Sequence, residues 1–117
     1  MRVIYLAGPY THSDHSIRKQ RFDALTEVAY ELLKQGNIVY SPITHTHPID
    51  LLFIRDDIHL ESSFYCDIDE TFMAMCSEMV IVTLDGWDRS PGVAREIAWF
   101  DDHNKPISFH EPIERVA

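Results

Sequence analysis

Apolar residues recur along this chain in two patterns, short unbroken runs and longer stretches at helical spacing. The unbroken runs have the length and the β-branched content of buried strands. The longer stretches place apolar residues three and four positions apart, as the buried face of a helix requires. These patterns predict strands at 2–7, 37–40, 79–84 and 107–109, and helices at 14–35 and 64–77.

A third helix is predicted to begin after the strand at 79–84. Ser90-Pro91 is typical of an N-cap followed by proline at the first helical position, where its missing N–H costs nothing. On that helix Glu96 falls within the apolar arc, between Trp99 and Phe100. Because burying an unpaired charge is costly, an acid at this position indicates a functional role.

Alternating strands and helices predict a three-layer α/β/α fold of the flavodoxin or Rossmann-like class, whose mainly parallel sheet has four to five strands. The 117 residues are enough for one core and too few for a separate substrate domain, so residues 1–117 form a single predicted domain. Residues 43–62 are the least regular part, since 44–48 is polar and turn-like whereas 49–54 is apolar. We expect a substrate loop there, with or without a short helix that packs on a second subunit.

Three segments follow predicted strands and should therefore meet at the carboxyl edge of the sheet, where ligands bind in such folds. They are residues 8–10, 41–47 and 85–90. The helix that carries Glu96 begins at the same edge. The predicted cleft and the misplaced acid therefore coincide.

Composition narrows the possible partners. The formal net charge of −9 argues against a nucleic-acid duplex, which requires a basic face. No apolar run approaches the roughly 20 residues that span a bilayer, and the first residues enter a strand without a signal-peptide core, so we expect a cytoplasmic protein that binds no membrane. Cys66 and Cys76 form no CxxC pair and are expected to be reduced thiols.

Two motifs carry a family resemblance. Tyr5-Leu6-Ala7-Gly8-Pro9 at the first strand and Ser90-x-Gly92-x-x-x-Glu96 after a later strand resemble the nucleoside 2-deoxyribosyltransferase-like superfamily. This superfamily includes the deoxyribosyltransferases and the 2′-deoxynucleoside 5′-monophosphate N-glycosidases. Within it, the chain is most similar to a short branch found in bacteria and phages.

The resemblance implies a role for four residues. Glu96 matches the family's nucleophilic carboxylate, Asp69 its upstream acid, and Tyr5 the tyrosine that orients the nucleophile, while Ser90 matches a serine that contacts phosphate or sugar. The implied activity is cleavage or transfer of the N-glycosidic bond of a 2′-deoxynucleoside or its 5′-monophosphate, without a cofactor. A carboxylate suits this chemistry because the reaction passes through an oxocarbenium-like sugar. The expected substrate-binding residues are Gly8, Pro9, Tyr10, His47, Asp85, Gly86, Trp87, Ser90 and Gly92.

Some positions depart from the family pattern. Pro9-Tyr10-Thr11 replaces the Ser/Arg-containing phosphate loop of the monophosphate glycosidases, which leaves recognition of a 5′-phosphate open. Asp69 lies about one residue further from the following strand than in better-studied members, and Ala98 stands where many have glycine. Related enzymes complete their clefts across a subunit interface, so we expect a homodimer or a higher homo-oligomer, with the apolar residues 49–54 as a candidate contact.

Each of these residues also has a structural interpretation. Glu96 could neutralise Arg95 or Arg89, Asp69 could be a solvated surface acid, Tyr5 could be a core residue, and Ser90 could serve as a helix cap alone. Two other functions stay open at this point. One is a nucleotide-binding module without turnover, and the other is a metal-assisted hydrolase that uses His45 and His47. A bare HxH motif without a spaced carboxylate is weak evidence for zinc, so we expect no native metal site.

Overall fold

The computed structural model describes residues 1–61 and 63–114. Its centre is a four-stranded sheet with the order β2-β1-β3-β4, in which all neighbouring strands pair in parallel. The strands are β1 (Val3–Ala7), β2 (Ile38–Tyr40), β3 (Glu78–Val82) and β4 (Ile107–His110). All four predicted strands are confirmed, with small shifts at their ends.

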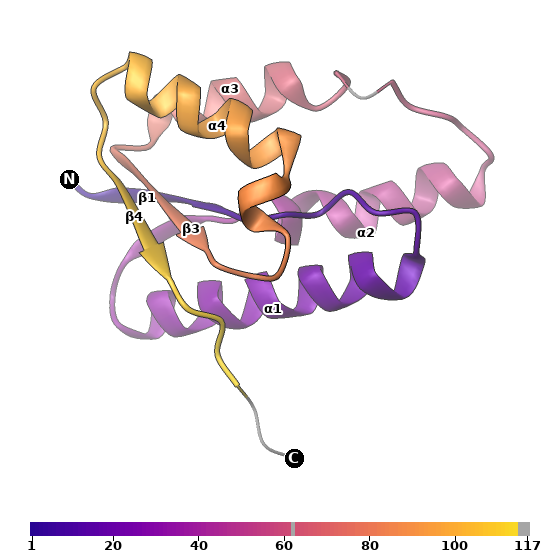
Figure 1. Cartoon of the computed structure of the whole chain (residues 1–117), viewed down its shortest axis with the longest axis horizontal. Helices are drawn as coiled ribbons and strands as arrows, with labels where there is room; N and C mark the ends of the chain where they lie inside the picture. The colour runs from indigo at the N-terminus through magenta and orange to yellow at the C-terminus, as the bar shows by residue number, and fades with distance from the viewer. Residues whose placement is uncertain (62, 115–117) are drawn as a thin grey trace.

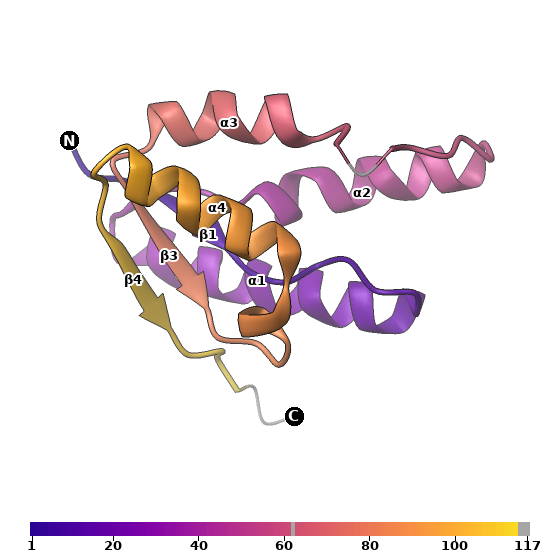
Figure 2. The ribbon, with the colours of Figure 1, turned by 45° about the horizontal axis from the view of Figure 1, so that its top comes forward.

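Helices cover both faces of this sheet (Figure 1). One face is covered by α1 (His15–Lys34), and the other by α3 (Cys66–Met75) and α4 (Pro91–Asp102). In the turned view, α2 (Pro42–Arg55) lies near α1 and reaches past the ends of the strands (Figure 2). The predicted three-layer α/β/α architecture is confirmed.

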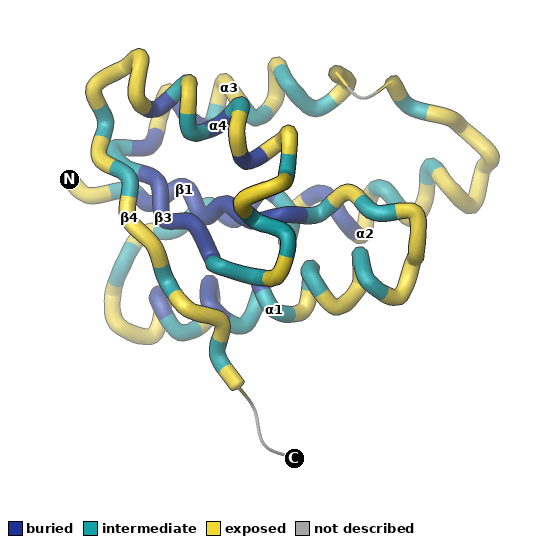
Figure 3. Tube along the Cα trace, viewed as in Figure 1, coloured by how far each residue is buried: buried dark blue, intermediate teal, exposed yellow. Residues whose placement is uncertain are grey.

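The two central strands, β1 and β3, are buried almost throughout (Figure 3). Because successive side chains of a strand point to opposite faces, β1 contributes to two separate cores. Ile4 and Leu6 pack with α1, whereas Tyr5 and Ala7 pack with residues of α3 and α4. This alternation places Tyr5 on the face that also carries the two candidate acids.

The helix α1 begins and ends where the sequence predicts. The side chain of Asp14 accepts a hydrogen bond of 2.8 Å from the backbone N–H of Ser16 and so caps the first turn. Gly36 follows the last turn with a positive φ of 89°, a conformation that glycine adopts without steric cost. These local signals were sufficient to fix the helix.

The prediction of a turn at residues 44–48 is wrong, because these residues lie inside α2. Pro42 follows Ser41 at the start of this helix, as Pro91 follows Ser90 in α4. The polar side chains are satisfied within and around the helix: Thr46 donates to the carbonyl of Pro42 at 2.8 Å, and the hydroxyl of Thr44 lies 2.8 Å from that of Thr26. Pro48 lies within the helix, where it removes one backbone donor.

The two remaining helices follow the predicted order. The observed α3 is shorter at both ends than the predicted 64–77, and α4 has Ser90 as its N-cap, with its side chain accepting from the N–H of Val93 at 3.2 Å. A short 3₁₀ turn, η1 (Trp87–Arg89), precedes it. Cys66 and Cys76 are free thiols, as expected. Within the described ranges, no helix has both the length and the apolar content to cross a membrane.

Candidate active site

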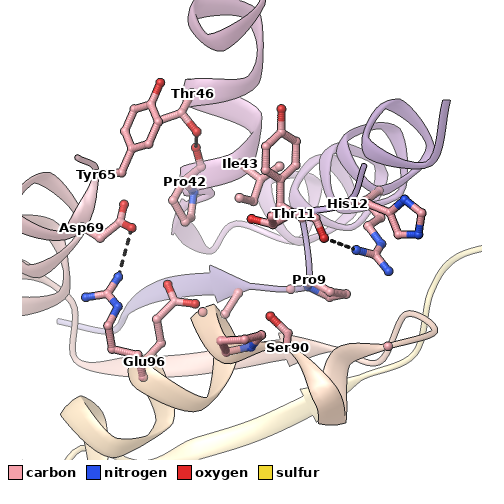
Figure 4. A pocket seen from close by; sticks show the side chains of 18 of the residues that line it. Pro9, Thr11, His12, Pro42, Ile43, Thr46, Tyr65, Asp69, Ser90 and Glu96 are labelled. Atoms are coloured by element: carbon pink, nitrogen blue, oxygen red, sulfur yellow. Dashed lines mark hydrogen bonds and ion pairs between the residues drawn. The ribbon is translucent and has the colours of Figure 1, made fainter. Parts of the chain in front are cut away.

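A cavity of about 810 Å³ opens at the carboxyl edge of the sheet. Its wall is formed by the segments that follow β1 and β3 and by the starts of α2, α3 and α4 (Figure 4). In the order β2-β1-β3-β4, the chain runs outward from β1 to β2 and then crosses back to β3 on the other side of β1. Ligands of such folds usually bind at the carboxyl ends of the strands, next to this reversal between β1 and β3. The cavity therefore lies where the sequence predicts it.

Glu96 lies at this cavity from α4 and is 7% exposed. The hydroxyl of Tyr5, which is fully buried on β1, donates a hydrogen bond to Glu96 Oε2. Burial raises the pKa of Glu96 to about 7, while the Tyr5 hydrogen bond and the charge of Arg95 act in the opposite direction. Near neutral pH this carboxyl group can therefore gain or lose a proton.

Tyr5 also belongs to the core. Its ring packs against those of Tyr40 and Phe100, with centroids 6.1 Å and 5.6 Å away. Burial and the nearby carboxylates raise its pKa far above the ordinary value, so the hydroxyl keeps its proton and acts as a donor to Glu96. The core role and the orienting role considered for this residue are therefore compatible.

Asp69 comes from α3 and lines the same cavity, with its side chain 15% exposed. Burial raises its pKa to about 6, and the positive charge of Arg95 opposes this rise. Figure 4 shows its carboxylate joined to a guanidinium below it, and the distance from Asp69 Oδ2 to Arg95 Nη2 is 3.4 Å. Asp69 is thus partly buried rather than a solvated surface acid.

Arg95 bridges the two helices that carry the acids. Besides Asp69, it lies 3.5 Å from Glu70 Oε1 through Nη1, a buried nitrogen that makes no hydrogen bond to the described residues. Arg95 also lines the cavity, and its positive charge lowers the pKa of both Asp69 and Glu96. The sequence left open that Glu96 neutralises Arg95. In the structure, Arg95 instead forms ion pairs with Asp69 and Glu70.

The loops after β1 and β3 are joined by another arginine. Arg21 of α1 donates to the carbonyl of Thr11 at 3.0 Å and to that of Asp85 at 3.3 Å. Gly86, next to Asp85, has a φ of 91°. At Gly8 an added Cβ would lie 2.7 Å from Leu25 Cδ2, so a larger residue there requires the buried Leu25 side chain to shift.

Comparisons with known proteins place the chain in a family. A family model described as "Domain of unknown function (DUF1937)" matches residues 2–112. The chain belongs to the DUF1937 family. Comparison with the curated proteins gives no match.

A solved structure of a 2-deoxyribosyltransferase from Bacillus psychrosaccharolyticus has the same fold. It is 18% identical, the alignment covers 98% of this chain and 76% of that chain, and the TM-score is 0.64. The deoxyribosyltransferase-like fold that the sequence motifs imply is therefore confirmed for this DUF1937 domain.

Most of the predicted site residues line the DUF1937 cavity. Glu96, Asp69 and Ser90 face it together with Gly8, Pro9, Tyr10, Asp85, Gly86 and Gly92. Tyr5 lies beneath the lining and reaches it through its bond to Glu96. Ser90 both caps α4 and lines the cavity, so its two interpretations are compatible.

Two predicted binding residues lie outside the cavity lining. The ring of His47 stacks on Phe22 with centroids 4.4 Å apart, and its Nδ1 lies 2.6 Å from the Tyr10 hydroxyl. Trp87 packs against Phe109, with a centroid distance of 5.3 Å. His47 is therefore buried between α1 and the first loop, whereas Trp87 is half-buried and packs against exposed Phe109.

The two histidines of the HxH motif do not converge. Two residues apart on a helix, their side chains point about 200° apart around its axis. His47 faces Tyr10 and Phe22, whereas His45 Nδ1 lies 3.0 Å from the Tyr40 hydroxyl. Among the described residues no group of three or more His, Cys, Asp or Glu side chains is placed to hold a metal ion.

Several lining residues were not predicted. They are Thr11, His12, Arg21, Thr46, Tyr65, Cys66, Arg89 and Arg95, besides apolar and small residues. No motif marks Tyr65. Arg21 belongs to a basic group near the start of α1, which is more typical of a solvated face than of an anion site. Thr46 and Arg89 had a signal, since both lie in segments already expected at the carboxyl edge.

Proposed function

We propose that this DUF1937 protein cleaves or transfers the N-glycosidic bond of a 2′-deoxynucleoside or its 5′-monophosphate, with Glu96 as the nucleophile. The observation that carries the proposal is the buried Glu96 carboxyl group, held by the Tyr5 hydroxyl at a cavity that a second acid, Asp69, also lines. Enzymes that cleave glycosidic bonds typically use two carboxyl groups that face the same cavity.

The proposed reaction uses the two acids in different protonation states. The Glu96 carboxylate attacks the anomeric carbon of the sugar as the bond from that carbon to the base nitrogen breaks. Asp69 donates its proton to the departing base, and burial lets it hold that proton to higher pH than an ordinary aspartate does. Because Glu96 competes for the same proton, the reactive form is the one in which the proton lies on Asp69. Water or a second nucleobase then takes the sugar from Glu96, which gives hydrolysis or transfer, respectively.

Other residues of the cavity lining support recognition of a polar or anionic 5′ end. Arg21 and Arg89 both line the cavity, and the first turn of α4 begins there at Ser90-Pro91-Gly92. Helix N-termini and guanidinium groups favour anions. These arginines supply the cations that Pro9-Tyr10-Thr11 lacks, so 5′-monophosphates belong among the candidate substrates.

The deciding experiment measures free-base release from a panel of 2′-deoxynucleosides and their 5′-monophosphates. The wild-type protein is expected to release base from at least one substrate, and Glu96→Ala to lower that rate on the order of a thousandfold. Glu111→Ala, an exposed acid near the end of the described chain, is the matched control and should retain full activity.

The same panel separates the other two functions. If the wild-type protein releases no base but a nucleotide raises its melting temperature, the protein is a binding module without turnover. If base release is lost on adding a chelator and restored by a metal, the reaction is metal-assisted and the glutamate mechanism fails.

We also propose that the protein forms a homodimer through the exposed apolar side chains near the C-terminal end of α2. Leu51, Leu52 and Ile54 are each more than 40% exposed on the part of α2 that reaches past the strands (Figure 2). Several exposed large apolar side chains close together on one helix are typical of a protein interface. The proposed dimer contact and Thr46, a residue that lines the cavity, lie on the same helix.

A further inference from the structure

A hydrogen-bonded network joins α2 to two tyrosines of the cavity wall. Asp50 Oδ2 accepts a bond of 3.2 Å from the Tyr10 hydroxyl, and Oδ1 accepts one of 3.1 Å from the Tyr65 hydroxyl. The Tyr10 oxygen also lies 2.6 Å from His47 Nδ1. The donor and acceptor in this contact depend on the tautomer of His47.

The network depends on the unpredicted helix. His47 and Asp50 are three residues apart on α2 and so lie on one face of it. Phe22 of α1 stacks on His47 and holds that face in place. Because an ionised carboxylate accepts stronger hydrogen bonds than a neutral group, Asp50 is well suited to anchor two hydroxyls at once.

Both tyrosines lie outside regular structure, and Asp50 accepts a hydrogen bond from the hydroxyl of each. Tyr10 follows β1 in the first loop, and Tyr65 immediately precedes α3. Both line the cavity, whereas Asp50 does not. Burial raises the pKa of Tyr65 to about 12 and also raises that of Tyr10, so both hydroxyls stay protonated donors at neutral pH.

The arrangement leaves aromatic carbon facing the cavity. Figure 4 shows the Tyr65 ring beside Asp69, with its hydroxyl directed away from that carboxylate. A group that stacks on this ring lies next to the acid that would protonate a leaving base. Flat heterocycles are the ligands that aromatic side chains bind by stacking.

We propose that Asp50 is a positioning residue that, through Tyr10 and Tyr65, shapes an aromatic subsite for the base of the substrate. This inference rests on the proposed function for the identity of its ligand. Asp50 does not reach the reacting atoms, so its loss affects base binding and the Michaelis constant rather than the chemical step. Loss of one stacking contact typically weakens binding about tenfold or more.

The test measures binding of free adenine, hypoxanthine, cytosine and thymine by calorimetry. The proteins compared are the wild type, Asp50→Ala, Tyr65→Phe and the double variant, with Asp102→Ala at the exposed end of α4 as the matched control. Tyr65→Phe keeps the ring and removes only the hydroxyl, so it tests the anchor even if Asp50→Ala folds poorly. On the active enzyme, kcat and KM are measured for the same proteins.

The inference predicts that at least one base binds and that Asp50→Ala and Tyr65→Phe each weaken its binding about tenfold. Because Asp50→Ala already removes the bond that Tyr65→Phe removes, the double variant should be no weaker than Asp50→Ala. In turnover, KM should rise with kcat nearly unchanged, which a general loss of folded protein would not produce.

The outcomes separate the subsite from the reaction. Base binding that is weakened by Asp50→Ala in a protein without turnover supports the subsite while the proposed function fails. Turnover accompanied by equal base binding in the wild type and Asp50→Ala overturns the inference and leaves the proposed function standing. Failure of all four bases to bind the wild type also overturns it.

Discussion

Glu96 is subject to two opposing influences at the scale of a single residue. Burial favours its neutral form, whereas the Tyr5 hydrogen bond and the charge of Arg95 favour the carboxylate. The result is a pKa of about 7, close to that of Asp69 at about 6. With pKa values this close to neutral, the two carboxyl groups gain and lose protons in the pH range where enzymes commonly work. One of them can then act as a carboxylate nucleophile while the other acts as an acid.

Replacing Glu96 by glutamine should change stability in a pH-dependent way. The folded protein binds the Glu96 proton more tightly than the unfolded chain, so the stabilisation is complete below the ordinary pKa of 4.5 and is lost as the pH rises through about 7. Glutamine does not titrate, so Glu96→Gln should gain about 2–3 kcal/mol relative to the wild type between pH 5 and pH 8. Urea unfolding at the two pH values measures this difference, and an equal effect at both would contradict it.

The two acids should give base release a bell-shaped dependence on pH, with limbs near 6 and 7. The charge of Arg95 lowers both pKa values, so Arg95→Met should move both limbs, and the optimum, to higher pH. Tyr5, Tyr40 and Tyr65 also surround this pair and remain in the variant. The variant releases Glu70 from its ion pair, and because the charge of Glu70 raises the pKa of Asp69, this change acts in the same direction. Profiles of kcat/KM against pH for the wild type, Arg95→Met and the surface control Lys19→Met decide the matter, and an unmoved optimum refutes the role of Arg95.

At the scale of the elements, the site depends on how closely the first loop and α4 approach their neighbours. Gly8 lets the chain leave β1 against Leu25 of α1, and Gly92 lies in the first turn of α4. Both glycines were predicted as binding residues from the same motifs. The structure gives them different physical constraints, because an added Cβ at Gly92 has its nearest neighbour, Ser90 Oγ, at 3.8 Å.

Alanine at these two glycines should therefore have opposite effects on stability. Gly8→Ala forces Cβ against buried Leu25 and should cost about 1–3 kcal/mol. Gly92→Ala replaces glycine in a helix without a clash and should gain up to about 1 kcal/mol. Denaturant unfolding measures both. If Gly92→Ala is more stable yet loses substrate binding, Gly92 serves the ligand, as predicted from the sequence; destabilisation by Gly92→Ala would contradict the geometry.

At the scale of the whole molecule, the parallel order β2-β1-β3-β4 brings segments distant in sequence to one edge. The same topology leaves α2 extending past the strands with an exposed apolar end (Figure 2). The cavity and the exposed patch are therefore two consequences of one arrangement.

The proposed homodimer should dissociate when a charge is placed in this patch. Leu52 is 50% exposed on α2, and Leu33 is 54% exposed on α1. Leu52→Glu should give a monomer because it buries a charge in the interface, whereas Leu33→Glu should leave the dimer intact. Light scattering after gel filtration gives the masses, and a wild-type monomer or a dimeric Leu52→Glu would refute the proposed contact.

The sequence by itself determined the strands, three of the four long helices and the edge at which the cavity lies. These features follow from local patterns, such as the apolar runs of β1 and β3 and the Ser90-Pro91 start of α4, because backbone periodicity and capping act over a few residues. It also marked Glu96, since a charge on an apolar helix face is visible from spacing alone. It did not reveal α2, because the polar residues 44–46 are satisfied by partners that include Thr26 on another helix.

Only the tertiary structure decided which side chains act together. Arg95 meets Asp69 from a different helix, and Asp50 meets Tyr10 and Tyr65 from separate segments. His47 and Trp87 were expected in the cavity, but His47 is buried against Phe22 and Trp87 packs against Phe109. Such pairings depend on how whole elements are oriented against one another, and short-range sequence patterns carry no information on that orientation.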